Sequence, residues 1–223
     1  ALSFDGTNDY VDCGSVDGTE GITTMSISGW FNPTTAGEVG VPGLIVKETR
    51  DWYIGWYNSP VNSIRFLISS DDGATTDSLN SVSIGSDDAV LNKWHHFVCT
   101  WDASDKLKIY INGVLSNEDN TVNANSALPT STNIVEIGRR GSTYFNGSIS
   151  SPKVFDVALT LAQIQEMYLN PEQILPTGVA SSNLKLYLPM NEGAGTTNYD
   201  GSGNNNHGTI SGATWVKAET DIA

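Results

Sequence analysis

Cysteine and positive charge are both scarce in this chain of 223 residues, which has two cysteines and 11 lysines and arginines. The basic residues face 25 aspartates and glutamates, so the formal net charge is −14. A surface of that sign repels the phosphates of nucleic acids and of anionic lipids, and we expect no nucleic-acid partner. No window approaches the roughly 18 consecutive apolar residues of a membrane-spanning helix. We therefore expect no membrane insertion.

Two cysteines cannot hold a metal ion by themselves, and the separation of Cys13 and Cys99 matches no short metal-binding or redox motif. We interpret both as small buried apolar residues, with a disulfide between them as the alternative. Neither is a convincing nucleophile, because only the neighbouring His95 and His96 offer an activating group.

Charged residues make up only 16% of the chain, beside 22 glycines and 8 prolines. This composition excludes a disordered acidic tail and a helical bundle rich in Ala, Glu, Lys and Leu. Ser, Thr, Asn and Asp are abundant instead and favour turns between short runs of strand-forming residues. The length suits one domain over residues 1–223. The sequence starts at Ala1 inside a strand-like segment, so we expect a piece of a larger polypeptide or assembly.

Apolar and polar residues alternate with a period of two through the first 150 residues, and turn residues interrupt them every 8 to 14 positions. This spacing is typical of an all-β sandwich. One helix is predicted at 160–168, with Thr160 as its N-cap and Pro171 behind it. The predicted strands are 1–4, 10–13, 24–31, 43–47, 52–57, 63–69, 77–84, 94–101, 106–112, 133–137, 147–155, 184–190 and 209–216.

Five segments, which cover nearly the whole chain, resemble one family. They are ALSFDGTNDYVDCG, TTMSISGWFNP, WHHFVCTWDASDKLKIYINGVL, IVEIGRRGSTYFNGSISSPKVFDVALTLAQIQEMY and LKLYLPMNEGAGTTNYDGSGNNNHGTISGATW. In this spacing the set is similar to laminin-G-like domains of the concanavalin A-like jelly-roll superfamily. The resemblance implies an all-β fold, a jelly-roll sandwich of two antiparallel sheets with one short helix. The residues support this antiparallel fold independently, because Asn112-Gly113 is a strong signal for a hairpin turn.

The order of these segments is unusual, because the segment that usually opens such a domain stands last, at 184–216. Three interpretations stay open. The chain is a circular permutant in which 184–216 completes the sandwich, it is a fragment of a tandem array, or its tail pairs with another subunit. We favour the permutant, because both ends of the core would otherwise leave unpaired edge strands.

Catalytic motifs of this fold class are missing. Its glycoside hydrolases carry closely spaced carboxylates on one strand, as in Glu-x-Asp-x-x-Glu, and no such triplet occurs. Its lyases need Gln, His, Tyr and Arg on strands across one groove, and the nearest sequence, 163–165, falls in the predicted helix. We therefore expect no enzyme and no catalytic residues.

Two tyrosines are the strongest candidates for ligand binding. Alternation directs Trp52 and Trp56 into the core and Tyr53 and Tyr57 to the outer face, with a glycine leaving a gap between the two phenol rings. Arg65 of the next strand shares that face. Flat rings with hydroxyls at their edges suit a sugar, so we predict a carbohydrate site there. The alternative is that both tyrosines are ordinary surface residues.

Other candidates surround this prediction. His96 has the parity of an outward-facing residue, and we expect it near the tyrosines. Arg139 and Arg140 either pair with carboxylates or hold an acidic sugar. Trp30 lies on the outer face unless a bulge turns it inward, and the resemblance favours a packing role.

Acidic and amide side chains gather in the loops at 4–9, 69–73, 86–88 and 199–206. Calcium favours such oxygen-rich loops, although the spacing matches no EF-hand. The predicted ligands of a structural calcium ion are Asp5, Asp200, Asn204 and Asn206. The alternative is that these side chains only cap turns. Ser150 and Ser151 stand where many members of the family have acidic residues, so a calcium ligand at that position is lost.

We expect a non-catalytic recognition module that binds a polysaccharide or a cell-surface glycan through the concave sheet and rim loops, as the resemblance implies. The rival hypothesis is a structural, decoration or adhesion domain of a virion, a fibre or a cell-surface protein. A glycan-active enzyme is the third alternative. The first two hypotheses predict an extracellular, cell-surface or virion-surface location, and affinity for a glycan array separates them.

Overall fold

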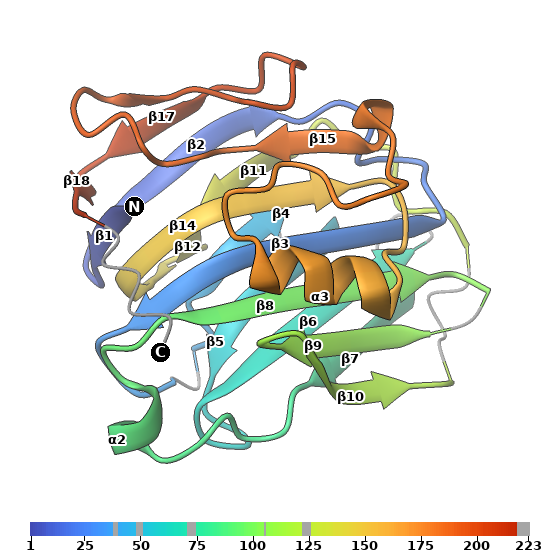
Figure 1. Cartoon of the computed structure of the whole chain (residues 1–223), viewed down its shortest axis with the longest axis horizontal. Coiled ribbons are helices and arrows are strands. Elements are labelled where there is room, and N and C mark those ends of the chain that lie inside the picture. Colours follow the sequence, from blue (N-terminus) through green and yellow to red (C-terminus); the bar gives the residue numbers. More distant parts are fainter. Residues whose placement is uncertain (38–39, 48–50, 71–74, 105, 122–125, 218–223) are drawn as a thin grey trace.

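The chain forms a sandwich of two antiparallel sheets, as predicted. The computed structural model describes residues 1–37, 40–47, 51–70, 75–104, 106–121 and 126–217. The front sheet faces the viewer in Figure 1 and carries α3 (Leu161–Leu169) on its outer side, and the back sheet lies behind it. In this described part, no helix is long and apolar enough to cross a membrane.

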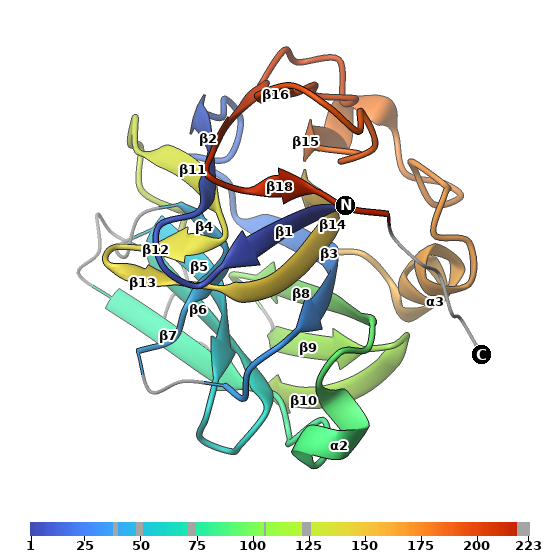
Figure 2. The ribbon, with the colours of Figure 1, turned by 90° about the vertical axis from the view of Figure 1, so that its left-hand side faces the viewer.

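The front sheet has the order β10-β9-β8-β3-β14-β1-β18, and β15 also pairs with β14 (Figure 2). Its strands are β10 (Val114–Asp119), β9 (Leu107–Ile111), β8 (His95–Asp102), β3 (Thr24–Pro33), β14 (Asn146–Phe155), β1 (Leu2–Asp5), β18 (Thr214–Trp215) and β15 (Leu184–Tyr187).

The back sheet has the order β16-β17-β2-β11-β4-β5-β6-β7. Its strands are β16 (Thr197–Asn198), β17 (Gly208–Ser211), β2 (Tyr10–Ser15), β11 (Ile134–Ile137), β4 (Gly43–Lys47), β5 (Trp52–Tyr57), β6 (Ser63–Ser70) and β7 (Thr75–Asn80). A short ribbon of β12 (Arg139–Arg140) and β13 (Thr143–Tyr144) follows β11. The short helices are α2 (Asp87–Val90) and η2 (Ser181–Asn183).

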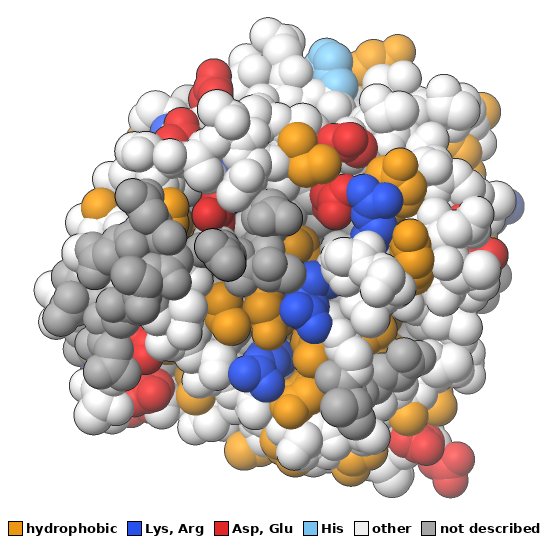
Figure 3. Space-filling view, turned by 180° about the vertical axis from the view of Figure 1, so that it is seen from behind, with side chains coloured by type: hydrophobic (Ala, Val, Ile, Leu, Met, Phe, Trp, Pro, Cys, Tyr) orange, Lys and Arg blue, Asp and Glu red, His pale blue; other side chains and the backbone are white. Residues whose placement is uncertain are grey.

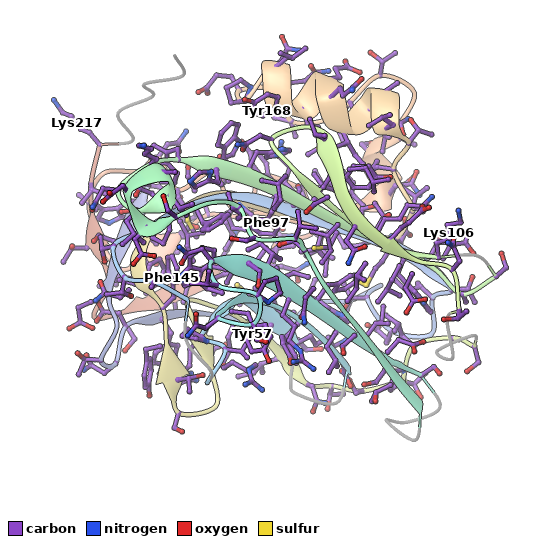
Figure 4. All side chains as sticks on the ribbon, turned by 90° about the horizontal axis from the view of Figure 1, so that it is seen from below. Tyr57, Phe97, Lys106, Phe145, Tyr168 and Lys217 are labelled. Carbon is purple, nitrogen blue, oxygen red and sulfur yellow. The ribbon has the colours of Figure 1, made fainter. Side chains whose placement is uncertain are left out.

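The predicted alternation fills the space between the sheets. The ring of Phe31 in β3 lies 5.4 Å from that of Trp56 in β5 and 6.0 Å from that of Phe97 in β8, centroid to centroid. All three side chains are buried, as is Trp52. Figure 4 shows Phe97 between the sheets, with Tyr57 and Tyr168 on opposite outer sides. Burial of these large aromatic surfaces is the main force that holds the sheets together.

The predicted helix is present as α3, and its start follows from a capping box. The side chain of Gln163 accepts a hydrogen bond from the backbone N–H of Thr160 at 2.9 Å, and the hydroxyl of Thr160 accepts one from the N–H of Gln163. The apolar side of the helix buries Ile164 and Met167 in a cluster that includes Tyr110 of β9. The helix thereby covers part of the outer face of the front sheet.

Residues 184–215 supply strands to both sheets. Tyr187 of β15 lies opposite Lys153 of β14, Ile210 of β17 lies opposite a residue of β2, and β18 pairs with β1. The single predicted strand at 209–216 is wrong, because Gly212 adopts a left-handed φ of 77° and turns the chain from the back sheet to the front sheet.

Two further differences concern a strand end and a hairpin. The strand predicted at 77–84 ends at Asn80. Val82 beyond it is exposed, so the alternation of residues there does not reflect burial in the core. Asn112 and Gly113 both have positive φ in the predicted turn, and this turn leads into β10, which the alternation did not predict.

The two cysteines are free and buried, in different sheets: Cys13 lies in β2 and Cys99 in β8. Their interpretation as small buried apolar residues is confirmed, and the disulfide alternative is wrong. Burial raises the pKa of both thiols, which leaves them protonated and unreactive at neutral pH.

Candidate functional site

A row of arginines stacked on tyrosines crosses the outer face of the back sheet. These residues, which we call the arginine row, are three of the four arginines of the chain. Figure 3 shows basic groups gathered over hydrophobic side chains on this face. The pairs are Arg139 on Tyr10, Arg140 on Tyr53 and Arg65 on Tyr57, with the guanidinium carbon 3.6, 4.6 and 5.1 Å from the ring centroid.

The face predicted for Tyr53, Tyr57 and Arg65 is correct, but the open gap between the phenol rings is not present. Tyr53 is buried, because Val41 covers the strand at Gly55. A Cβ atom at Gly55 would lie only 2.5 Å from the Val41 side chain, so the glycine serves this close approach. A sugar therefore has no flat platform between the two rings, while Tyr57 stays partly exposed.

The three guanidiniums differ in their partners. Arg139 forms an ion pair with Glu136, which raises the pKa of the guanidinium. Arg140 donates hydrogen bonds to the carbonyls of Val41 at 2.9 Å and of Gly40 at 2.6 Å. The expectation that both arginines pair with carboxylates therefore holds for Arg139, whereas Arg140 forms no ion pair with a carboxylate that the structure describes.

Arg65 also has no carboxylate partner. Its Nη2 donates to the hydroxyl of Ser78 at 3.2 Å, and its buried Nε finds no acceptor among the residues that the structure describes. Within the same described ranges, no ion pair involves Arg65 or Arg140. Among the residues that the structure describes, no carboxylate balances the charge of these two guanidiniums.

His96 lies on the other side of the molecule, so its predicted position near the tyrosines is wrong. It faces outward from β8 in the front sheet, where Trp30 and Tyr168 of α3 cover it, with ring centroids 4.9 and 6.0 Å away. Burial, together with the charge of Lys153, lowers the pKa of His96 to about 3. The pairing of β3 with β8 is regular along Thr24–Phe31, so Trp30 lies on the outer face without a bulge.

The predicted calcium ligands do not come together. Asp200 accepts four hydrogen bonds, from the N–H groups of Tyr187, Ser202 and Asn206 and from the hydroxyl of Ser202, at 2.7–3.0 Å. Asn204 and Asn206 donate their amide groups to the carbonyl of Lys185 at 3.1 and 2.9 Å. The Asn206 and Asn204 side chains thus offer their nitrogens, not oxygens, to this loop.

Asp5 lies in a different part of the sheet. It pairs with Asn146 at one end of β14, whereas Tyr187, which contacts Asp200, pairs with Lys153 seven residues along that strand. At the rise of a β-strand this separation is roughly 20 Å. Over the described ranges, no group of three or more His, Cys, Asp or Glu side chains is arranged to hold a metal ion. Asp5 therefore does not share one ion with Asp200, Asn204 and Asn206, and calcium binding itself stays a prediction.

A cleft of about 550 Å³ opens on the front sheet and is lined by residues that include Tyr187 of β15 and Trp215 of β18. Figure 2 shows these two strands as separate segments on this side of the sheet. One edge of β14 pairs with β1 up to Ile149 and with β15 from Lys153 onward, which leaves Ser150 and Ser151 between the two partners. The register shifts there, and Ser151 adopts a left-handed φ of 51°. Bulges of this kind re-aim side chains and are common next to binding sites.

The walls of this cleft combine aromatic and polar side chains. Its chemistry comes from Ser150, Ser151, Glu172, Tyr187, Trp215 and Lys217. The indole N–H of Trp215 donates to the carbonyl of Gly195 at 2.8 Å, which fixes the ring. Burial and the charge of Glu172 raise the pKa of Tyr187, although a hydrogen bond with Ser151 lowers it. Behind Tyr187, the buried ammonium of Lys153 lies 4.9 Å from the ring centroid.

The sequence analysis missed this cleft. One signal was available: in the 184–188 segment the leucines occupy one parity and Tyr187 the other, which places Tyr187 on an outer face. The approach of Trp215 and Glu172 to that face was not predictable, because it depends on the bulge at Ser151 and on the path of the loop after α3.

The family comparison agrees with this fold. The family model described as Laminin_G_3, concanavalin A-like lectin/glucanases superfamily, matches residues 5–165. The chain belongs to this superfamily. Because the match ends before β15, the circular permutation stays a prediction. A search of curated proteins found no match.

Solved structures share the superfamily fold at low identity. A candidate carbohydrate-binding protein of Bacteroides ovatus superposes with a TM-score of 0.70 and 17% identity, over 96% of this chain and 58% of that one. The chain thus spans less than two thirds of that relative. A heptameric SAP-like pentraxin of Limulus polyphemus gives a TM-score of 0.54 at 15% identity, over 75% of this chain and 80% of that one. The binding domain of Paraclostridial Mosquitocidal Protein 1 gives 0.51 at 11%, over 67% and 38%.

Proposed function

We propose that this superfamily member is a non-catalytic carbohydrate-recognition module whose sugar site is the cleft beside Tyr187 and Trp215. The observation that carries the proposal is the cleft itself, whose volume of about 550 Å³ lies in the usual range of small-molecule sites. Trp215, which is partly exposed, offers an apolar face to a sugar ring, and Tyr187, which is mostly buried, lines the cleft beside it. The hydroxyls of Ser150 and Ser151 and the charged groups at the rim suit the ring hydroxyls.

The site is held in place before a ligand arrives. Trp215 is fixed by its hydrogen bond to Gly195, and Tyr187 is wedged over Lys153, whose ammonium donates to the Gln173 carbonyl at 2.6 Å. A fixed site loses less conformational entropy on binding. The carbohydrate-binding description of the Bacteroides ovatus relative supports a sugar as the ligand. An extracellular, cell-surface or virion-surface location is part of the same proposal.

The cleft lacks the groups of a glycosidase. Such enzymes place two carboxyl groups about 5 to 9.5 Å apart on either side of the scissile bond. Among the described residues that line the cleft, Glu172 is the one carboxylate. His96 is buried behind Trp30 and does not line the cleft, so it supplies no general base there. We therefore propose binding without turnover.

The test is a glycan array, followed by calorimetry with a neutral oligosaccharide that the array identifies. Trp215→Ala should weaken binding about thirtyfold, since a central aromatic anchor contributes about 2 kcal/mol. Tyr187→Phe should weaken it about fivefold through the lost hydroxyl. Tyr199→Ala is the matched control, because Tyr199 is an exposed aromatic residue outside the cleft.

Three outcomes would overturn the proposal. Affinity within a factor of two in both folded cleft variants would place the sugar elsewhere. Turnover of the bound glycan would make the protein an enzyme. No binding to any glycan on the array would favour a structural, decoration or adhesion domain instead.

A further inference from the structure

The arginine row is a concentration of positive charge on a strongly acidic protein. The chain carries 25 acidic residues, yet Arg65 and Arg140 form no ion pair with any described carboxylate. Arg139, the third member, is balanced by Glu136. An unpaired guanidinium on such a surface attracts an anion that comes from outside the chain.

Both unpaired guanidiniums are held in place. Arg140 lies on the Tyr53 ring and is tied to two backbone carbonyls, at Gly40 and Val41. Arg65 lies on the partly exposed Tyr57 ring. Stacking on an aromatic ring orients the plane of a guanidinium and leaves its edge for hydrogen bonds. The Arg65 side chain is partly exposed, but its Nε is buried and has no acceptor within the described part of the chain, so the guanidinium meets a ligand through its terminal nitrogens.

We propose that the arginine row is a second binding site, independent of the cleft, for a glycan that carries carboxylate groups. A planar carboxylate accepts two parallel hydrogen bonds from one guanidinium, which is a stronger and more directional contact than a neutral hydroxyl makes. The exposed part of Tyr57 offers an apolar surface beside Arg65 for the sugar ring that carries the carboxylate.

The spacing of the two tyrosines bears on how many carboxylates the ligand carries. Their tyrosines, Tyr53 and Tyr57, are four residues apart on one face of β5, which corresponds to roughly 13 Å along the strand. Because each guanidinium lies on its own ring, we infer that one carboxylate does not bridge both arginines. A ligand that uses the whole site therefore carries at least two carboxylates on one chain, as an oligouronate does.

The net charge of the protein selects against denser polyanions. With −14 over the whole chain, the surface around the arginine row repels nucleic acids and highly sulfated chains, whose charges are closely spaced. A glycan with one carboxylate per sugar unit carries less charge near that surface. At physiological ionic strength the repulsion is screened beyond about 8 Å, while contacts to the two guanidiniums persist.

The experiment is calorimetry with trigalacturonate, compared with its fully methyl-esterified form, which has the same sugar rings without charge. The acid should bind and the ester should bind at least about tenfold more weakly, a difference of about 1.4 kcal/mol. Arg65→Gln should weaken binding of the acid by a similar factor, and Arg140→Lys, which keeps the charge but loses the planar fork, should also weaken it. Lys93→Gln is the matched control, because it removes one exposed positive charge outside the arginine row.

The two sites can be distinguished with one more variant. Trp215→Ala should leave trigalacturonate binding unchanged while it weakens binding of a neutral sugar at the cleft about thirtyfold. Loss of trigalacturonate binding in Trp215→Ala but not in Arg65→Gln would overturn this inference and assign the acid to the cleft. No binding by the wild-type protein, equal binding of acid and ester, or equal losses in Arg65→Gln and Lys93→Gln would overturn it as well.

Discussion

His96 shows how strongly burial acts on a single residue of this protein. The imidazole is 2% exposed, packs against the rings of Trp30 and Tyr168, and has the ammonium of Lys153 near it. Both the loss of water and the neighbouring positive charge oppose protonation, so the pKa falls to about 3. The ring is therefore neutral through the physiological range and acts as a packing residue under α3.

This burial predicts a loss of stability in acid. The unfolded chain protonates His96 near the ordinary pKa of about 6.5, whereas the folded chain resists protonation down to about 3. Stability from this group is thus fully present above pH 6.5 and is lost as the pH falls toward 3. At pH 4 the loss is roughly 3 kcal/mol, at about 1.4 kcal/mol per pKa unit. Urea unfolding at pH 7 and pH 4 should show a smaller loss for His96→Gln than for the wild type, with His207→Gln as an exposed control.

Residue parity predicted faces correctly and contacts poorly. It placed Trp52 and Trp56 in the core and Arg65 on the outer face. It could not predict that Val41 covers Gly55, because Val41 lies in the loop before β4, where no alternation indicates its position. For the same reason it gave His96 the right orientation but the wrong neighbours.

The bounds of an element were predictable where one of its faces stays buried in the core along its whole length. β4 and β5 have the predicted bounds, and α3 begins one residue after its predicted cap. The bulge of β14 at Ser151 was not predictable, because residues 150–152 lie between the stretch that pairs with β1 and the stretch that pairs with β15. The cleft forms at this bulge. A prediction from regular alternation therefore does not find it.

The C-terminal strands should be essential to the fold. Residues 184–215 bury Leu186, Leu188 and Ile210 and cover the edge of β1. Each such side chain contributes about 1.5–3 kcal/mol, and together they approach the whole stability of a typical domain. A chain that ends at Pro176 should therefore lose its cooperative thermal transition, whereas one that ends at Lys217 should keep it. Equal melting temperatures of the two would show that this segment is dispensable.

At the scale of the whole molecule, the two candidate sites lie on different sheets, and each has its own chemistry. The cleft on the front sheet has aromatic walls and hydroxyls, while the back sheet has two guanidiniums that form no ion pair with a described carboxylate. The sandwich between them is filled by Phe31, Phe97 and Trp56. Ligands at the two sites should therefore bind without competing, which is why variants of one site serve as controls for the other.

The net charge of −14 gives a prediction for the whole molecule and a test of the calcium hypothesis. Like charges destabilise the compact state, and salt shortens the Debye length from about 30 Å at 0.01 M to about 10 Å at 0.1 M. Sodium chloride should therefore raise the melting temperature over that range.

Calcium chloride at equal ionic strength should give the same rise if the loop carboxylates only cap turns, as Asp200 does with its four hydrogen bonds. A calcium ion bound only to the folded state would add about 2.7 kcal/mol at a hundredfold excess over its Kd, and Asp200→Ala would remove that addition if Asp200 is a ligand.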